Sequence, residues 1–126
     1  MLKFIYLATG GIIGTLLRYT LSGPIQRLFG TYFPLGTLGI NLIGSLIAGL
    51  AWGTSEAYNL PINIRLFIFI GLLGSFTTYS AFLIENLELL RNGEYWFFVL
   101  NVLATVFFGM ALVFAGYFLS RYLIGN

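Results

Sequence analysis

Four long stretches of this sequence contain no charged residue, and this feature limits the possible folds more than any other. The stretches are residues 4–17, 28–55, 66–84 and 95–120. A helix of about 20 apolar residues crosses the hydrocarbon core of a bilayer. Charged residues make up 8% of the 126 residues, whereas a soluble domain has about 25%. Because the chain has too few charges for a water-facing surface, we expect an all-α integral membrane protein.

The four stretches predict four transmembrane helices in a single domain over residues 1–126. We place the helices at about 3–28, 34–56, 61–91 and 94–124. The connecting segments contain the Gly, Pro or Asn residues that are typical of turns. Pro34 and Pro61 stand where the first turn of a helix tolerates proline. The N-terminal segment is similar to a secretory signal but lacks a small-residue cleavage site, so we interpret it as a retained first span.

Composition also excludes several classes of function. The chain has no cysteine and no histidine, so we expect no disulfide, no thiolate or imidazole metal site, and no Cys or His nucleophile. The sequence shows no nucleophile paired with a base, so nothing in it indicates an enzyme. The net charge is +2, and the six basic residues are scattered along the chain. Without a basic patch, nucleic acid is not an expected partner.

The basic residues are balanced between the two ends of the predicted bundle. Four spans bring both termini to one side of the membrane, and each side then holds three basic residues: Lys3, Arg65 and Arg121 on one, Arg18, Arg27 and Arg91 on the other. Orientation normally follows an excess of Lys and Arg in the cytoplasmic loops. Two interpretations remain open. The balance is either chance in a small number of residues, or a sign of dual topology, in which copies insert both ways and pair antiparallel.

Small residues recur at the spacing that allows helices to approach closely in lipid. The chain has 16 glycines, and three pairs of small residues stand four positions apart: Gly10 with Gly14, Gly49 with Gly53, and Gly44 with Ala48. These pairs are explained equally well by tight packing within one chain and by a homo-oligomer.

Polar residues form stripes on three of the predicted helices, because residues at i, i+4 and i+8 share one face. The stripes are Thr37, Asn41 and Ser45; Asn101 and Thr105, continued by Gly109; and Gly11, Thr15 and Arg18. A single hydroxyl in a span is usually an interhelical hydrogen-bonding group. An asparagine brings a whole amide, with two donors and one carbonyl acceptor. Stripes on different helices therefore indicate a shared hydrated or ion-conducting path.

The chemistry of these stripes favours an anion over a cation. Glu85 is the one acid well inside a predicted span, so a carboxylate-lined cation or drug site is not expected. Hydroxyls, amide donors and the electropositive edges of phenyl rings solvate a small anion without a full charge, and they bind it weakly enough to let it leave. Glu85 itself has two open interpretations: a vestibule carboxylate that bonds a hydroxyl or a helix end, or a gate or proton site.

A polar segment, G-S-F-T-T-Y-S at residues 74–80, interrupts the third apolar stretch. Its residues are poor helix formers in sum, and short hydroxyl side chains compete for nearby backbone groups. Non-helical backbone occurs at membrane depth only where protein or water satisfies it. Broken helices then expose carbonyls that hold Na⁺ and amides that hold anions. The pattern alone leaves open whether the third helix is broken or intact with its hydroxyls bonded to its own backbone.

Three motifs resemble the Fluc/CrcB family of fluoride channels. They are G-x-x-G-x-x-x-R at residues 11–18, P-x-G-T-L-x-x-N-x-x-G at residues 34–44, and G-x-x-G-S-F-T-T-Y-S-x-F-x-x-E at residues 71–85. The third motif is the most specific. The resemblance covers essentially the whole chain, with four spans in the same order.

The resemblance implies a fluoride-selective channel that exports F⁻ passively across the bacterial inner membrane. It implies a multi-pass, dual-topology antiparallel homodimer in the lipid bilayer, with two fluoride pores and one central Na⁺. The third helix would be broken near the midplane, at residues 74–78. Main-chain carbonyls of Gly74 and Thr77 from both subunits would hold the Na⁺, and oxygen ligands suit a hard cation.

The resemblance also implies site residues: the pore aromatics Tyr79 and Phe82, the pore asparagine Asn41, the pore hydroxyl Thr105 and the vestibule arginine Arg18. From their places in the polar stripes and the polar segment, we also expect Thr37, Ser80 and Asn101 in the pore lining. Glu85 is expected in the vestibule. Two residues depart from the family pattern, since Tyr79 stands where Phe is usual and Asn101 where Tyr is frequent. The Tyr79 hydroxyl would either contact the anion or bond Asn41 and leave the ring edge to fluoride.

Two other functions fit the same size and number of spans. A small dual-topology antiporter of multidrug or guanidinium cations needs an acid embedded in the first span. That span has none, so Glu85 would have to substitute. The remaining alternative is a structural membrane subunit with no transport of its own.

Overall fold

A computed structural model describes residues 1–29 and 32–125. All regular structure in these residues is helical: α1 (Leu2–Phe29), α2 (Leu35–Ala57), α3 (Ile62–Arg65), the π-helix η1 (Leu66–Leu73), α4 (Gly74–Phe76), α5 (Tyr79–Arg91) and α6 (Tyr95–Ile124). Elements α3 to α5 form one interrupted span. Four segments are long and apolar enough to cross a membrane: Leu2–Leu28, Leu35–Ala57, Ile62–Arg91 and Tyr95–Ile124. The prediction of an all-α protein with four spans is confirmed.

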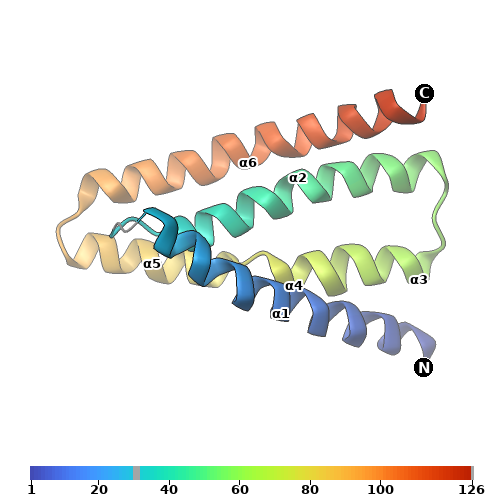
Figure 1. The fold of residues 1–126 in the computed structure, drawn as a ribbon, viewed down its shortest axis with the longest axis horizontal. Helices are drawn as coiled ribbons and strands as arrows, with labels where there is room; N and C mark the ends of the chain where they lie inside the picture. The colour runs from blue at the N-terminus through green and yellow to red at the C-terminus, as the bar shows by residue number, and fades with distance from the viewer. Residues whose placement is uncertain (30–31, 126) are drawn as a thin grey trace.

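The helix ends lie within one residue of the ranges expected from the sequence. In the turn expected at residues 30–34, residues 30 and 31 lie outside the described residues, as does Asn126 at the end of the expected domain. Successive spans run in opposite directions, and both chain ends lie at the same end of the bundle (Figure 1). Lys3, in the first turn of α1, and Arg121, in the last turn of α6, therefore share one end. Arg27 and Arg91, in the last turns of α1 and α5, lie at the other.

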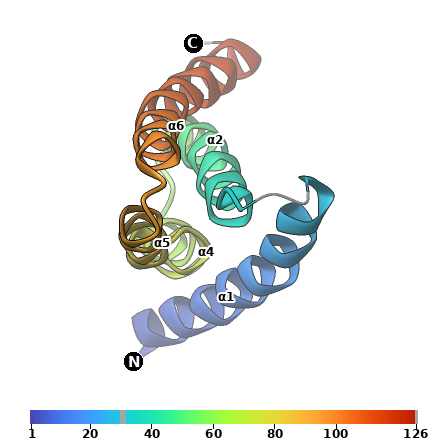
Figure 2. The same cartoon turned by 90° about the vertical axis from the view of Figure 1, so that its left-hand side faces the viewer.

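Helix α6 packs mainly along α2, while α1 stands on the far side of the bundle against the third span (Figure 2). Glycines bring α2 and α6 together. A Cβ atom on Gly49 would overlap the Val113 carbonyl oxygen, and one on Gly116 would overlap the Leu46 carbonyl oxygen. Gly49 is thus used for packing within one chain.

Glycines also bring α1 against the first half of the third span. A Cβ on Gly10 would lie 2.6 Å from the Phe67 carbonyl oxygen and 2.9 Å from the Leu72 nitrogen. This half of the span is π-helical over Leu66–Leu73, a feature that the sequence pattern did not predict. π-Helices are rare, and the single π-helical turns found within α-helices are frequent at functional sites. Here the π-helix directly precedes α4 and the interruption of the span.

The third span is broken near its middle, so the broken form is the one that the structure contains. Helix α4 ends at Phe76, and α5 begins at Tyr79. Between them, Thr77 has φ −79° and ψ 158°, and Thr78 has φ −145° and ψ 115°. Both residues are extended, which removes one turn of helical hydrogen bonds at the depth of the bilayer core.

Candidate functional site

Asn41 on α2 replaces part of the hydrogen bonding that the helix break removes. Its Nδ2 donates to the Thr78 carbonyl oxygen at 3.1 Å, and its Oδ1 accepts from the Thr78 N–H at 2.8 Å. A side-chain amide has the same donor and acceptor groups as a peptide bond, and Thr78 is extended. Asn41 therefore pairs with Thr78 as a neighbouring strand would, and satisfies both of its main-chain groups.

Hydroxyls bond the backbone on both sides of the break. Ser75 Oγ donates to the Gly71 carbonyl at 2.6 Å, and Thr77 Oγ1 donates to the Leu73 carbonyl at 2.9 Å. Thr78 Oγ1 accepts from the Ala81 N–H at 3.2 Å and caps the N-terminus of α5. The polar side chains of this segment thus stabilise two helix ends.

These bonds leave two carbonyls without their usual donors. In a continuous helix, the Gly74 carbonyl would accept from the Thr78 N–H, and the Thr77 carbonyl would accept from the Ala81 N–H. The Thr78 N–H is instead given to Asn41 Oδ1, and the Ala81 N–H to Thr78 Oγ1. Gly74 and Thr77 are the two residues whose carbonyls the family resemblance assigned to a cation.

A cavity of about 480 Å³ lies on one side of the break. Six of the site residues expected from the sequence line it: Asn41, Gly74, Thr77, Tyr79, Phe82 and Thr105. The rings of Tyr79 and Phe82 stack with centroids 6.1 Å apart and an interplanar angle of 30°. Phe82 is buried, whereas 74% of Tyr79 is exposed in the single chain. The lining combines aromatic rings, hydroxyls and one amide and contains no carboxylate.

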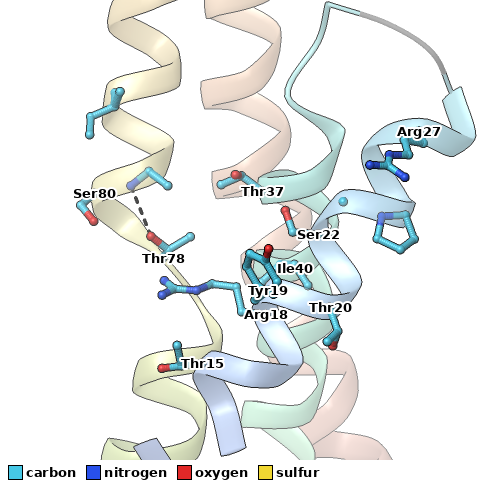
Figure 3. A pocket seen from close by; sticks show the side chains of 14 residues that line it. Thr15, Arg18, Tyr19, Thr20, Ser22, Arg27, Thr37, Ile40, Thr78 and Ser80 are labelled. Atoms are coloured by element: carbon cyan, nitrogen blue, oxygen red, sulfur yellow. Dashed lines mark hydrogen bonds between the residues drawn. The ribbon is translucent and has the colours of Figure 1, made fainter. Parts of the chain in front are cut away.

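A second cavity, of about 830 Å³, lies between α1, α2 and α5 (Figure 3). Arg18, Arg27, Thr37 and Ser80 line it with several other hydroxyl residues, and its lining contains no acid. The Arg18 side chain extends from α1 toward the extended segment at Thr78 (Figure 3). Thr78 lines both cavities. The break therefore separates a cationic, hydroxyl-rich cavity from an aromatic one.

Glu85 lies beside these cavities at the end of the bundle opposite the termini. Thr37 Oγ1 donates a hydrogen bond to Glu85 Oε1. Glu85 also lines a third cavity, of about 360 Å³, together with Glu88 and Glu94. Glu85 is thus a carboxylate that is hydrogen-bonded by a hydroxyl from α2.

Asn101 lies apart from the other expected pore residues. It is 1% exposed, lines none of the three cavities, and donates from Nδ2 to Asn86 Oδ1 at 3.1 Å. Asn86 Nδ2 in turn donates to the Phe82 carbonyl at 2.9 Å. Asn86 was not singled out from the sequence. Its position four residues after Phe82, in an apolar span, is the signal that could have identified it.

The fold and these cavities define a multi-pass membrane protein with a polar break in its third span. The family described as "CrcB-like protein, Camphor Resistance (CrcB)" matches residues 5–117. The chain is 44% identical over 124 residues to the "Fluoride-specific ion channel FluC" of Parabacteroides distasonis, covering 98% of this chain and 97% of that protein. It is 39% identical to proteins of the same name from Maridesulfovibrio salexigens (98% and 99% covered) and Thermus thermophilus (99% and 100% covered). The chain belongs to the CrcB family, and it is a multi-pass protein of the bacterial plasma membrane. Its relatives are named as ion channels rather than as enzymes.

Proposed function

We propose that this protein is a passive, fluoride-selective channel that exports F⁻ from the cytoplasm. The observation that carries the proposal is the cavity beside the helix break, which Asn41, Tyr79, Phe82 and Thr105 line without a carboxylate. Relatives that match nearly the full length of the chain bear the name of a fluoride channel. The lining offers partial positive charges to an anion and no fixed negative charge.

The proposed path combines a cationic entrance with a neutral pore. Arg18 and Arg27 line the larger cavity, and a cleft of one charge raises the local concentration of the opposite ion. Beyond the break, fluoride would meet the edges of the aromatic rings, which carry the positive end of the ring quadrupole. The Asn41 NH₂ group has two N–H donors, of which one is given to Thr78. An array of such weak donors lets the ion leave as readily as it enters. Thr37 and Ser80 line the larger cavity and complete the proposed lining, whereas Asn101 is buried and lines neither cavity. Glu85 accepts a hydrogen bond from Thr37 beside this path.

The working unit of the proposal is an antiparallel homodimer with two pores. Gly74, Tyr79 and Ser80 lie near the middle of the third span and are exposed in the single chain. Polar groups and broken backbone are not left facing lipid at this depth, so a second copy is the simplest cover for them. The equal division of basic residues between the two ends supports insertion in both orientations.

The proposal includes one Na⁺ at the dimer centre, held by the Gly74 and Thr77 carbonyls of both copies. The residues fit such an ion, because the N–H donors that would occupy these two carbonyls in a helix are bonded to side chains instead. Neutral main-chain oxygens are suitable ligands for a hard monovalent cation. When bound, Na⁺ would supply positive charge that satisfies the broken backbone.

A cation antiporter is less well supported by the same geometry. The described residues of α1 contain no acid. Glu85, the acid that would have to replace it, is engaged by the Thr37 hydroxyl. ΔpH-driven uptake of a cationic dye into proteoliposomes would support the antiporter.

The experiment that tests the proposal is anion efflux from liposomes that contain the purified protein. Liposomes are loaded with fluoride or chloride, and efflux is followed with ion-selective electrodes after valinomycin is added. We expect rapid F⁻ efflux and little Cl⁻ efflux. Absence of F⁻ efflux, or equal efflux of both ions, contradicts the proposal. If dye uptake is also absent, the structural-subunit alternative is the remaining one.

A further inference from the structure

Two buried asparagines join α5 to α6 beside the backbone of Phe82, which lines the aromatic cavity. Asn86 is 4% exposed and Asn101 is 1% exposed. Asn101 Nδ2 donates to Asn86 Oδ1 at 3.1 Å, and Asn86 Nδ2 donates to the Phe82 carbonyl at 2.9 Å. The two amides therefore form a continuous hydrogen-bonded connection from α6 to the backbone of Phe82.

Helix α6 packs mainly on α2 and much less on α5. Side-chain hydrogen bonds are therefore important for fixing the position of α5. Among the described residues, α5 has two such bonds to other helices beyond its first turn. Thr37 on α2 donates to Glu85, and Asn101 on α6 donates to Asn86. Glu85 and Asn86 are adjacent in sequence and so point in directions about 100° apart around the helix. Two bonds in different directions determine the rotation of α5 about its own axis.

We propose that Asn86 and Asn101 are positioning residues for the Phe82 ring, fixing the direction in which its edge faces the aromatic cavity. This inference rests on the proposed function, in which that edge contacts the permeating anion. Phe82 leaves α5 one turn before Asn86 on the same face, so a rotation of α5 moves its ring directly. Asn101 thus contributes to selectivity through Asn86 and Phe82.

The pair is polar although apolar side chains would fill the same buried space. Asn101 Oδ1 is buried and has no hydrogen-bond partner among the described residues. A pair of apolar residues would fill the same space without leaving a buried acceptor unsatisfied, which is costly. The amide pair therefore supplies an orientation that apolar packing does not specify.

The test places a fluorine probe on the ring itself. 4-Fluorophenylalanine is incorporated at position 82 alone, and ¹⁹F NMR spectra are recorded in fluoride-free lipid nanodiscs. The variants are Asn86→Leu, Asn101→Leu and the double variant, with Leu87→Ala as the control. Leu87 is 55% exposed on the same helix. F⁻ and Cl⁻ efflux are measured on the same variants without the probe.

We expect each single variant to shift or split the ¹⁹F resonance. We also expect it to lower the ratio of F⁻ to Cl⁻ efflux by about fivefold, which is the change in an equilibrium ratio that corresponds to the net free energy of one hydrogen bond. The double variant keeps the fold, because replacing both partners of a buried bond with apolar groups is nearly neutral for stability. It is expected to retain the altered spectrum and ratio. A double variant with the spectrum and the ratio of the unmodified protein overturns the inference, because the pair would then serve stability alone. If the unmodified protein passes no fluoride, the proposed function fails, while the spectra still decide whether the pair positions the ring.

Discussion

Asn41 binds Thr78 across the helix break through both polar ends of its amide, with an Oδ1 to N distance of 2.8 Å and an Nδ2 to O distance of 3.1 Å. The same side chain lines the aromatic cavity. Asn41 therefore has two roles in the proposed channel: it completes the hydrogen bonding of the broken backbone, and it offers a second N–H toward the ion path. No other standard side chain of this length pairs with both groups of an extended residue.

Asn41→Asp is expected to reduce F⁻ efflux from proteoliposomes at least tenfold. The carboxylate keeps an acceptor for the Thr78 N–H, but it places a second oxygen against the Thr78 carbonyl oxygen. The buried carbonyl is then unsatisfied, at a cost of about 1–3 kcal/mol, and a negative charge faces the anion path.

The matched control for this change is Asn59→Asp. Asn59 lies in the turn after α2 with φ 47°, a conformation that aspartate also adopts. We expect efflux through this variant to stay within about twofold of the unmodified protein, as for surface changes of up to about 0.5 kcal/mol. Equal efflux through Asn41→Asp and Asn59→Asp would remove Asn41 from the conduction path.

The four spans were predictable from the sequence because their signal is local: each is a long apolar stretch bounded by turn residues. The break in the third span could not be decided from the local pattern of residues. Ser75 and Thr77 donate to carbonyls four residues earlier, which is also what an intact helix would show. The deciding contact is that of Thr78 with Asn41, 37 residues away in sequence. A pattern within one segment does not reveal such a partner.

The candidate site was predictable to a similar extent. The family motifs contain five of the expected site residues that line the aromatic cavity, namely Asn41, Gly74, Thr77, Tyr79 and Phe82, while Thr105 lies outside them. They did not give Asn86, whose role depends on the distance between α5 and α6. The polar stripe of the last span placed Asn101 with the pore residues, whereas its side chain is buried against Asn86.

Gly10→Ala is expected to destabilise the protein by about 1–3 kcal/mol, the usual cost of overpacking. The added Cβ would lie 2.6 Å from the Phe67 carbonyl oxygen and 2.9 Å from the Leu72 nitrogen. Both are backbone atoms, so α1 must move away from the third span. Thermal unfolding in detergent, followed by intrinsic fluorescence, measures the effect.

Gly11→Ala provides the control for Gly10→Ala, since a Cβ on Gly11 has no atom within 4 Å in the described chain. Alanine also favours the helix over glycine by about 1 kcal/mol. We therefore expect Gly11→Ala to match or exceed the stability of the unmodified protein. A melting temperature that falls equally in both variants would show that α1 does not depend on this close contact.

Removal of Na⁺ is expected to lower the melting temperature of the purified protein. A ligand that binds only the folded state at a hundred times its Kd stabilises that state by about 2.7 kcal/mol. Protein is exchanged from sodium chloride into N-methylglucamine chloride of equal ionic strength, because that cation is too large for a carbonyl site. Potassium chloride serves as a second comparison. Identical melting curves in all three salts would contradict a Na⁺ site at the Gly74 and Thr77 carbonyls.

The Tyr79 hydroxyl is expected to contribute less to conduction than an aromatic ring of the cavity. The Tyr79 hydroxyl has no hydrogen-bond partner in the described part of the chain, and the bonds of the Asn41 amide go to Thr78 instead. If the ring alone contacts the ion, Tyr79→Phe keeps F⁻ efflux within about twofold of the unmodified protein. Phe82→Ile removes an aromatic ring whose edge contributes about 0.5–1.5 kcal/mol, and it is expected to lower F⁻ efflux roughly tenfold. Single-vesicle efflux rates, normalised to the protein content of each vesicle, separate the two outcomes. A loss of F⁻ efflux in Tyr79→Phe that equals the loss in Phe82→Ile would show instead that the hydroxyl itself contacts the ion.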